Sequence, residues 1–221
     1  MSNPPKLSPT SYAMLGLLAR NPQSAYELNT IMQTSLIRVY WPRAESHVYS
    51  EPKKLLLHNF VTEQKEQLSG RNRTVYTITD LGRQSLQDWL QEKGNSDLRL
   101  QSEFMLKLIL ADNGSAEDAR ATLAHSHKAS TDDLKQAVAG IQQILDNPGY
   151  GVEGTPYNGI AINLMADMLI ARRRWDSFAL QALADISDGS SQADKINIGR
   201  AAYAQALKKL NAALDDHLIP S

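Results

Sequence analysis

The hydrophobic pattern of this chain changes its period once, and that change limits the fold more than any other feature. Phe60–Gln64 and Thr74–Ile78 are rich in β-branched and aromatic residues, as strands are, and the polar stretch Leu68–Arg73 between them predicts a turn. On both sides of this predicted hairpin the apolar residues recur at helical spacing, which predicts helices at about 10–20, 25–33, 44–58 and 80–90. The order helix, helix, helix, hairpin, helix predicts a winged helix-turn-helix.

Short-range signals support the ends of these predicted helices. Thr10 or Ser11 can cap the first helix, and Ser24 with Glu27 three residues later forms a capping box for the second. Asn59, which tolerates the left-handed conformation, is placed to close the third.

Pro52 leaves the third predicted helix open to two interpretations. A proline inside a helix removes a backbone hydrogen bond and typically costs ~3 kcal/mol. Either the helix runs from about 44 to 58 and is kinked at Pro52, or it begins near Glu51 with Pro52 in its first turn, where proline is tolerated. Within the third helix, the residues predicted to face the core are Val48, Leu55 and Leu56.

After residue 94 the pattern is helical throughout. Gly94–Ser96 is the predicted boundary between a winged helix-turn-helix domain at 1–94 and an all-helical domain at 95–221, so the fold class is mainly α. Gly140 and Ser126–Thr131 are candidate breaks in the second of the later helices. Those helices are predicted at 98–112, 115–147, 158–187 and 190–217.

Composition and charge restrict the classes of function. The 221 residues include no cysteine, which excludes thiol catalysis, disulfides and cysteine-based zinc sites. The net charge is −1, but residues 1–94 carry 11 Lys/Arg against 8 Asp/Glu, while residues 95–221 carry 12 against 16. A positive first domain joined to an acidic second domain is expected if only the first domain binds the phosphates of a nucleic acid. We see neither a signal peptide nor an apolar run long enough to span a bilayer, and we therefore expect a cytoplasmic protein without a membrane partner.

The third predicted helix and the hairpin carry the candidate DNA-binding residues. A helix fits the major groove and its outward polar side chains reach base edges, while a basic hairpin tip beside it can touch phosphate or the minor groove. The predicted DNA-binding residues are Ser46, His47, Tyr49, Ser50, Lys53 and Lys54 on the helix, and Arg71, Asn72 and Arg73 at the hairpin tip.

Sites of other kinds have little support in the sequence. His125 and His127 lie two residues apart on a predicted helix and point to different faces, so no metal site is predicted. We find no phosphate-binding glycine motif and no catalytic constellation, and we expect neither a cofactor nor an enzyme. The residues of a candidate effector pocket, whose apolar stripe is also compatible with plain core, are Tyr157, Met165, Met168, Trp175 and Phe178.

Residues 7–90 resemble the PadR-type transcriptional regulators. The resemblance is carried by LSPTSYAMLGLLARNPQSAYELNTIM, WPRAESHVYSEPKKLLLHNFVT and RNRTVYTITDLGRQSLQDWL. The stretch from LRLQSEFMLKLILA to ARRRWDSFALQAL resembles the longer branch of that family, which has a virulence-activator-type α-helical C-terminal domain, whereas 190–221 has no clear counterpart. Two residues depart from the family pattern, because the family usually has leucine where Pro52 stands and glycine where Asn59 stands.

The resemblance implies a sequence-specific regulator, with repression the favoured sign, that binds double-stranded operator DNA. One helix-turn-helix per chain implies a homodimer that reads two half-sites, and the apolar excess of the second domain implies that this domain dimerises. The same domain holds the candidate pocket for a possible small-molecule effector. The alternative is a winged-helix protein-protein interaction module without DNA binding, which Pro52 and the weak net charge favour.

Overall fold

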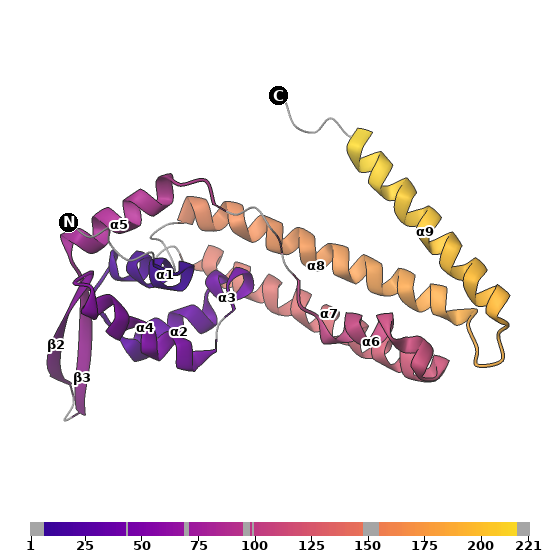
Figure 1. Ribbon diagram of the computed structural model, residues 1–221, viewed down its shortest axis with the longest axis horizontal. Helices are drawn as coiled ribbons and strands as arrows, with labels where there is room; N and C mark the ends of the chain where they lie inside the picture. Colours follow the sequence, from indigo (N-terminus) through magenta and orange to yellow (C-terminus); the bar gives the residue numbers. More distant parts are fainter. Residues whose placement is uncertain are drawn as a thin grey trace. The chain divides into compact units, whose positions relative to one another are not determined.

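The computed structural model describes residues 7–42, 44–68, 71–94, 98, 100–147 and 155–215. It divides into two compact units, one comprising residues 1–98 with 152–162 and the other residues 99–151 with 163–221. The predicted boundary at Gly94–Ser96 falls largely outside the described residues. Figure 1 labels the elements in chain order.

The first unit is a winged helix-turn-helix, as predicted. Its helices are α1 (Pro9–Leu18), α2 (Ala25–Thr34), α3 (Leu36–Tyr40), α4 (Glu45–Leu57) and α5 (Asp80–Gln91). Its strands are β1 (Gln23–Ser24), β2 (Val61–Leu68) and β3 (Arg71–Ile78). They form an antiparallel sheet in the order β1-β3-β2, in which Val61 is opposite Ile78 and Lys65 is opposite Thr74.

Several local predictions are confirmed and others need correction. The Ser24–Glu27 capping box is present at α2, and Asn59 adopts a left-handed conformation with φ 59° after α4. The cap of α1 is Ser8 instead of Thr10 or Ser11, because Pro9 can occupy the first helical position without losing a needed N–H. The short helix α3 and strand β1 were not predicted, since elements of five and two residues are too short to show a hydrophobic period.

The core of the first unit joins all of its main helices to the sheet. The side chains of Met14, Leu15, Leu28, Val48 and Leu55 are fully buried. Phe60 and Val61 at the start of the hairpin are buried with them. Leu56 is partly buried and packs against the same cluster. The predicted core face of α4, with Val48, Leu55 and Leu56, is therefore confirmed.

All elements described in the second unit are helical. They are α6 (Glu103–Ile109), the 3-10 helix η1 (Ala111–Asn113), α7 (Ala116–Asp146), α8 (Thr155–Ala184, of which residues 155–162 group with the first unit) and α9 (Gln192–Asp215). Neither Gly140 nor Ser126–Thr131 interrupts α7, and the helix predicted at 98–112 is shorter because Ser102 caps it and η1 follows it.

A polar contact lies inside the pairing of α7 with α8. The Ser126 hydroxyl donates to Asp176 Oδ1 at 2.8 Å, and both residues are buried. Arg172 donates to Asp133 at 2.8 Å across the same pair of helices. These contacts fix the register of α7 against α8, since a shifted register would leave the buried Asp176 carboxylate without its hydroxyl donor.

Candidate nucleic-acid interface

Helix α4 presents a polar face to solvent. Val48, Glu51, Pro52 and Leu55 are buried in the first unit, and the intervening residues 49, 50, 53 and 54 point outward. The predicted helix residues that are exposed are Ser46, His47, Tyr49, Ser50, Lys53 and Lys54, with Tyr49 at 41%. The amphipathic pattern of α4 therefore places all six predicted helix residues on the side away from the core.

Pro52 lies well inside α4. The helix begins at Glu45 and continues past Pro52 to Leu57, so the interpretation in which it begins near Glu51 is wrong. The proline ring is buried, and this tertiary packing offsets part of the cost of the missing backbone hydrogen bond. Ser46 and His47 thereby belong to the helix together with Lys53 and Lys54.

A buried carboxylate anchors α4 to the start of α1. Glu51, with a side chain that is 7% exposed, accepts hydrogen bonds from the hydroxyls of Ser8 (3.1 Å) and Ser11. Its second oxygen accepts from the Lys54 ammonium at 3.1 Å. Burial raises the pKa of Glu51, but the hydrogen bonds from Ser11, Lys54 and Ser8 outweigh burial and hold that pKa below its ordinary value of 4.5.

Replacing Glu51 with alanine is expected to lower the free energy of unfolding by about 1–3 kcal/mol, because the buried Ser11 hydroxyl loses its acceptor and the Ser8 hydroxyl loses its link to α4. A carboxyl with a lowered folded pKa stabilises the fold above its unfolded pKa and loses that contribution as the pH falls through the folded value. The difference between the two proteins should therefore be full at neutral pH and shrink below about 4.5. Urea unfolding at several pH values measures it, with Glu63→Ala on the exposed face of β2 as the control.

The wing, defined as strands β2 and β3, differs from the prediction at its tip. Arg71, Asn72 and Arg73 were expected on a polar turn, but all three belong to β3, where Asn72 pairs with Gln67 and Arg73 with Glu66. Asn72 is exposed, whereas the side chain of Arg71 lies outside the described ones. Polar residues continue the ladder here because backbone pairing between two long strands needs no buried side chain.

Arg73 holds the wing against α2. Its guanidinium donates to Glu66 on β2 at 3.0 Å and to Glu27 on α2 at 3.1 Å, and the side chain is 35% exposed. The backbone N–H and hydroxyl of Ser24, together with Arg73, hold the pKa of Glu27 below its ordinary value. Arg73 thus connects the capping box of α2 with both strands of the wing.

Lys65 is a wing residue that sequence reasoning missed. It is exposed on β2, opposite Thr74, and its ammonium forms no hydrogen bond or ion pair with another described residue. The predicted first strand ended at Gln64, so Lys65 was assigned no role. Extending the strand to Leu68 would have placed Lys65 on the wing.

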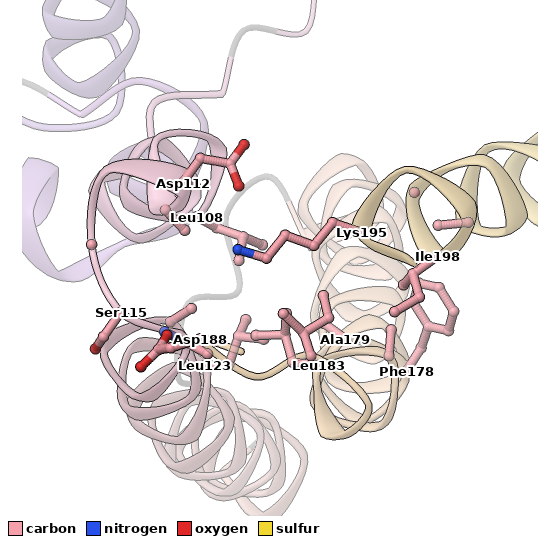
Figure 2. Close-up of a pocket in the computed structure, with 18 of the residues that line it drawn as sticks. Leu108, Asp112, Ser115, Leu123, Phe178, Ala179, Leu183, Asp188, Lys195 and Ile198 are labelled. Carbon is pink, nitrogen blue, oxygen red and sulfur yellow. The ribbon is translucent and has the colours of Figure 1, made fainter. Parts of the chain in front are cut away.

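The second unit contains a cavity of about 340 Å³ between α6, η1, α7, α8 and α9. Trp175 and Phe178 line it, whereas Tyr157, Met165 and Met168 do not, and Tyr157 is 79% exposed. Figure 2 shows that the Lys195 side chain extends from α9 into this cavity among apolar residues such as Leu123 and Ile198. The structure therefore brings two of the five predicted pocket residues together.

The described residues contain neither a cluster of metal ligands nor a membrane span. No group of three or more His, Asp or Glu side chains among them could hold a metal ion, and the His127 ring lies 2.7 Å from Arg173. Over the same residues, no helix combines the length and the apolar character needed to cross a bilayer.

Comparison with known proteins gives one family and several relatives. Residues 14–88 match the transcriptional regulator PadR-like family. The chain is 33% identical over 109 residues to the negative transcriptional regulator PadR of Bacillus subtilis, a match that covers 49% of this chain and 59% of that relative.

Three solved structures have a similar fold. Bacillus subtilis PadR in complex with operator DNA has a TM-score of 0.67 at 22% identity, covering 78% of this chain and 98% of that one. The same protein in complex with p-coumaric acid has a TM-score of 0.58 at 23% identity, covering 79% and 96%. The Vibrio cholerae virulence activator AphA has a TM-score of 0.56 at 22% identity, covering 80% and 96%. The winged helix-turn-helix with a helical second domain is therefore shared with these proteins.

Proposed function

We propose that the chain, whose residues 14–88 match the transcriptional regulator PadR-like family, is a sequence-specific, DNA-binding transcriptional regulator that acts as a homodimer. The observation that carries the proposal is the exposed polar face of α4 beside the wing. A helix with such a face, held by two other helices, is what the major groove accepts. Repression is the proposed sign, since the curated relative is a negative regulator.

The side chains of α4 divide by chemistry. Ser46, His47 and Ser50 carry donors and acceptors suited to base edges. In the free chain the Ser50 hydroxyl donates to the His47 carbonyl at 3.0 Å, and it would exchange this local bond for one to a base edge. Lys53, which has no hydrogen bond or ion pair to any described residue, supplies a free ammonium for phosphate. Lys54 is 62% exposed, so it can reach phosphate while its pairing with Glu51 persists. Tyr49 completes the proposed helix contacts.

The wing supplies contacts beside the helix. Lys65 and Asn72, which share one face of the wing, are the proposed DNA-facing residues, and Arg71, whose side chain lies outside the described ones, is proposed as a further contact to phosphate. Arg73 shares its guanidinium with two carboxylates, so its proposed role includes positioning the wing against α2.

The rival function is a winged-helix interaction module that does not bind DNA. The salt dependence of the affinity for DNA distinguishes the two functions. Full-length protein is titrated against pooled genomic fragments in a shift assay between about 50 and 200 mM salt. A regulator with several phosphate contacts should lose ~10³-fold or more of its affinity over this range. Absence of binding at the lowest salt, with the protein folded by circular dichroism, would favour the interaction module.

The cavity of the second unit is the proposed effector site. Its volume lies at the lower end of the roughly 300–1,000 Å³ typical of ligand pockets, and its lining is mainly apolar with one ammonium, Lys195, and two carboxylates, Asp112 and Asp188. Such a lining suits a small amphipathic molecule. A ligand of this cavity should raise the melting temperature of the natural chain and leave that of an Ala202→Trp variant, in which the cavity is filled, unchanged. The proposed location is the cytoplasm, where the proposed DNA partner is reached.

A further inference from the structure

Helix α9 has an exposed apolar stripe in addition to the face that it turns toward α8. The inner face contributes Lys195, Ile198 and Ala202 to the cavity, and Lys209 lies over the Phe178 ring at 4.8 Å. The second stripe lies roughly 110° around the helix, at about 100° per residue. We call it the α9 seam, and its apolar residues, with exposed fractions from 51% to 80%, are Ile196, Tyr203, Leu207, Leu210 and Leu214.

The spacing of the α9 seam is that of a coiled coil. Ile196, Tyr203 and Leu210 are seven residues apart, and Leu207 and Leu214 are also seven apart, which gives alternating steps of four and three. A repeat of 3.5 residues keeps a stripe facing a single partner helix along the whole contact. Nothing in the folding of one described chain covers these side chains, and α9 lies in the stretch that has no clear counterpart in the resembling family.

We infer that the α9 seam pairs with the α9 seam of a second copy of this chain, with the two helices antiparallel. Arg200 is the charged residue within the seam, and it decides the direction. Parallel, in-register pairing would place the two Arg200 side chains opposite each other, and like charges facing each other in a helix seam are unfavourable. This inference rests on the proposed homodimer and names its interface.

Antiparallel pairing about residue 205 places the seam leucines, Ile196 and Tyr203 opposite apolar residues, with Arg200 opposite Leu210 as the one exception. Ile196 then faces Leu214, Tyr203 faces Leu207, and Arg200 faces Leu210, where its stem packs on leucine while its head reaches solvent. The positions flanking the seam are uncharged, so no like charges oppose self-pairing. They are Asn197, Ala204 and Asn211 on one side and Gly199, Ala206 and Ala213 on the other.

Because the chain contains no cysteine, introduced cysteines can test whether the two α9 helices pair antiparallel. The double variant Ile196→Cys with Leu214→Cys should form a covalent dimer under mild oxidation, since these positions face each other in the antiparallel pair. Leu214→Cys alone should stay uncross-linked, because the two copies of residue 214 would be roughly 27 Å apart, far beyond disulfide reach. A covalent dimer of the single variant, or the absence of a covalent dimer in the double variant, would overturn the antiparallel arrangement.

The strength of the interface is tested by a neighbouring pair of variants. Leu207→Asp removes a seam leucine from both copies and should weaken dimerisation by about a hundredfold, roughly tenfold for each leucine. Lys208→Asp introduces the same side chain beside the seam and should leave dimerisation within a few-fold of the natural chain. Sedimentation over a range of concentrations measures both.

Shift assays on the same proteins distinguish this inference from the proposed function. If Leu207→Asp stays dimeric and binds DNA like the natural chain, the α9 seam is not the interface and the proposed regulator stands. If the natural chain is monomeric and binds no DNA, both the inference and the proposed function are overturned. Loss of the dimer in Leu207→Asp, with helix content unchanged by circular dichroism, is the result that the inference expects.

Discussion

Replacing Gly82 with alanine is expected to lower the free energy of unfolding of the first unit by about 2–3 kcal/mol, the range of a methyl group forced into a packed core. Gly82 lies in the first turn of α5, against Phe60, which precedes β2, and Ile78 at the end of β3. A Cβ at this position would lie 2.2 Å from the backbone oxygen of Phe60 and 2.9 Å from Ile78 Cγ1. The Phe60 carbonyl cannot move away freely, because it accepts from the Thr79 N–H at 3.0 Å and Phe60 itself is buried.

Gly16 provides a matched control in the same unit. It lies in the middle of α1, and a Cβ there meets nothing within 4 Å. Gly16→Ala should therefore raise the free energy of unfolding by up to ~1 kcal/mol through helix propensity alone. Thermal and urea unfolding of both variants measures whether each substitution lowers or raises the free energy of unfolding. Stabilisation by both substitutions would mean that α5 shifts to accept the methyl group and that its packing on Phe60 is loose.

The parts of the fold that could be predicted are those whose causes lie close together in the sequence. Ser24 and Glu27 are three residues apart and form the capping box on their own. Asn59 closes α4 through its own backbone preference, and the buried face of α4 follows from a periodic pattern over one helix. These features are therefore visible in the chain without knowledge of the tertiary structure.

The features that could not be predicted depend on residues far apart in the chain. Arg73 looked like free surface charge because its partner Glu27 is 46 residues away, and the pairing exists only once β3 lies beside α2. Among the side chains described in the outer half of the wing, none is both apolar and buried, so the hydrophobic pattern ends before the backbone ladder does. Pro52 lies inside α4 with its ring buried, and this tertiary packing offsets part of a local penalty that the sequence shows without its compensation.

The candidate site shows the same division. Outward residues of α4 were predicted correctly as exposed, since amphipathic spacing suffices for this. The cavity draws its lining from five elements of the second unit, and the spacing within α8 alone could indicate Trp175 and Phe178 but also suggested Met165 and Met168 on the same helix. A stripe on one helix does not reveal which part of it a neighbouring helix covers.

Replacing Lys53 with glutamate is expected to weaken DNA binding by roughly a hundredfold, about tenfold for each half-site of the proposed dimer. Lys53 lies at the centre of the exposed face of α4, opposite the buried Val48 and Leu55, so a groove that accepts α4 cannot avoid it. The substitution removes an ammonium that neutralises phosphate and brings a carboxylate toward a polyanion. The dependence of log affinity on log salt should flatten by about one unit for each phosphate that the variant no longer neutralises.

Stability is expected to change little in this variant, by no more than about 0.5 kcal/mol, because Lys53 is exposed and pairs with no described residue. Lys135→Glu on the exposed side of α7 makes the same change of net charge in the second unit and serves as the control. An equal drop in affinity in both variants would indicate a long-range effect of net charge. Salt should abolish such an effect, because charges farther apart than the Debye length, about 10 Å at 0.1 M salt, are largely screened. A drop confined to Lys53→Glu, with an unchanged melting temperature, places α4 against the DNA, and equal affinity of both variants with the natural chain would remove α4 from the interface.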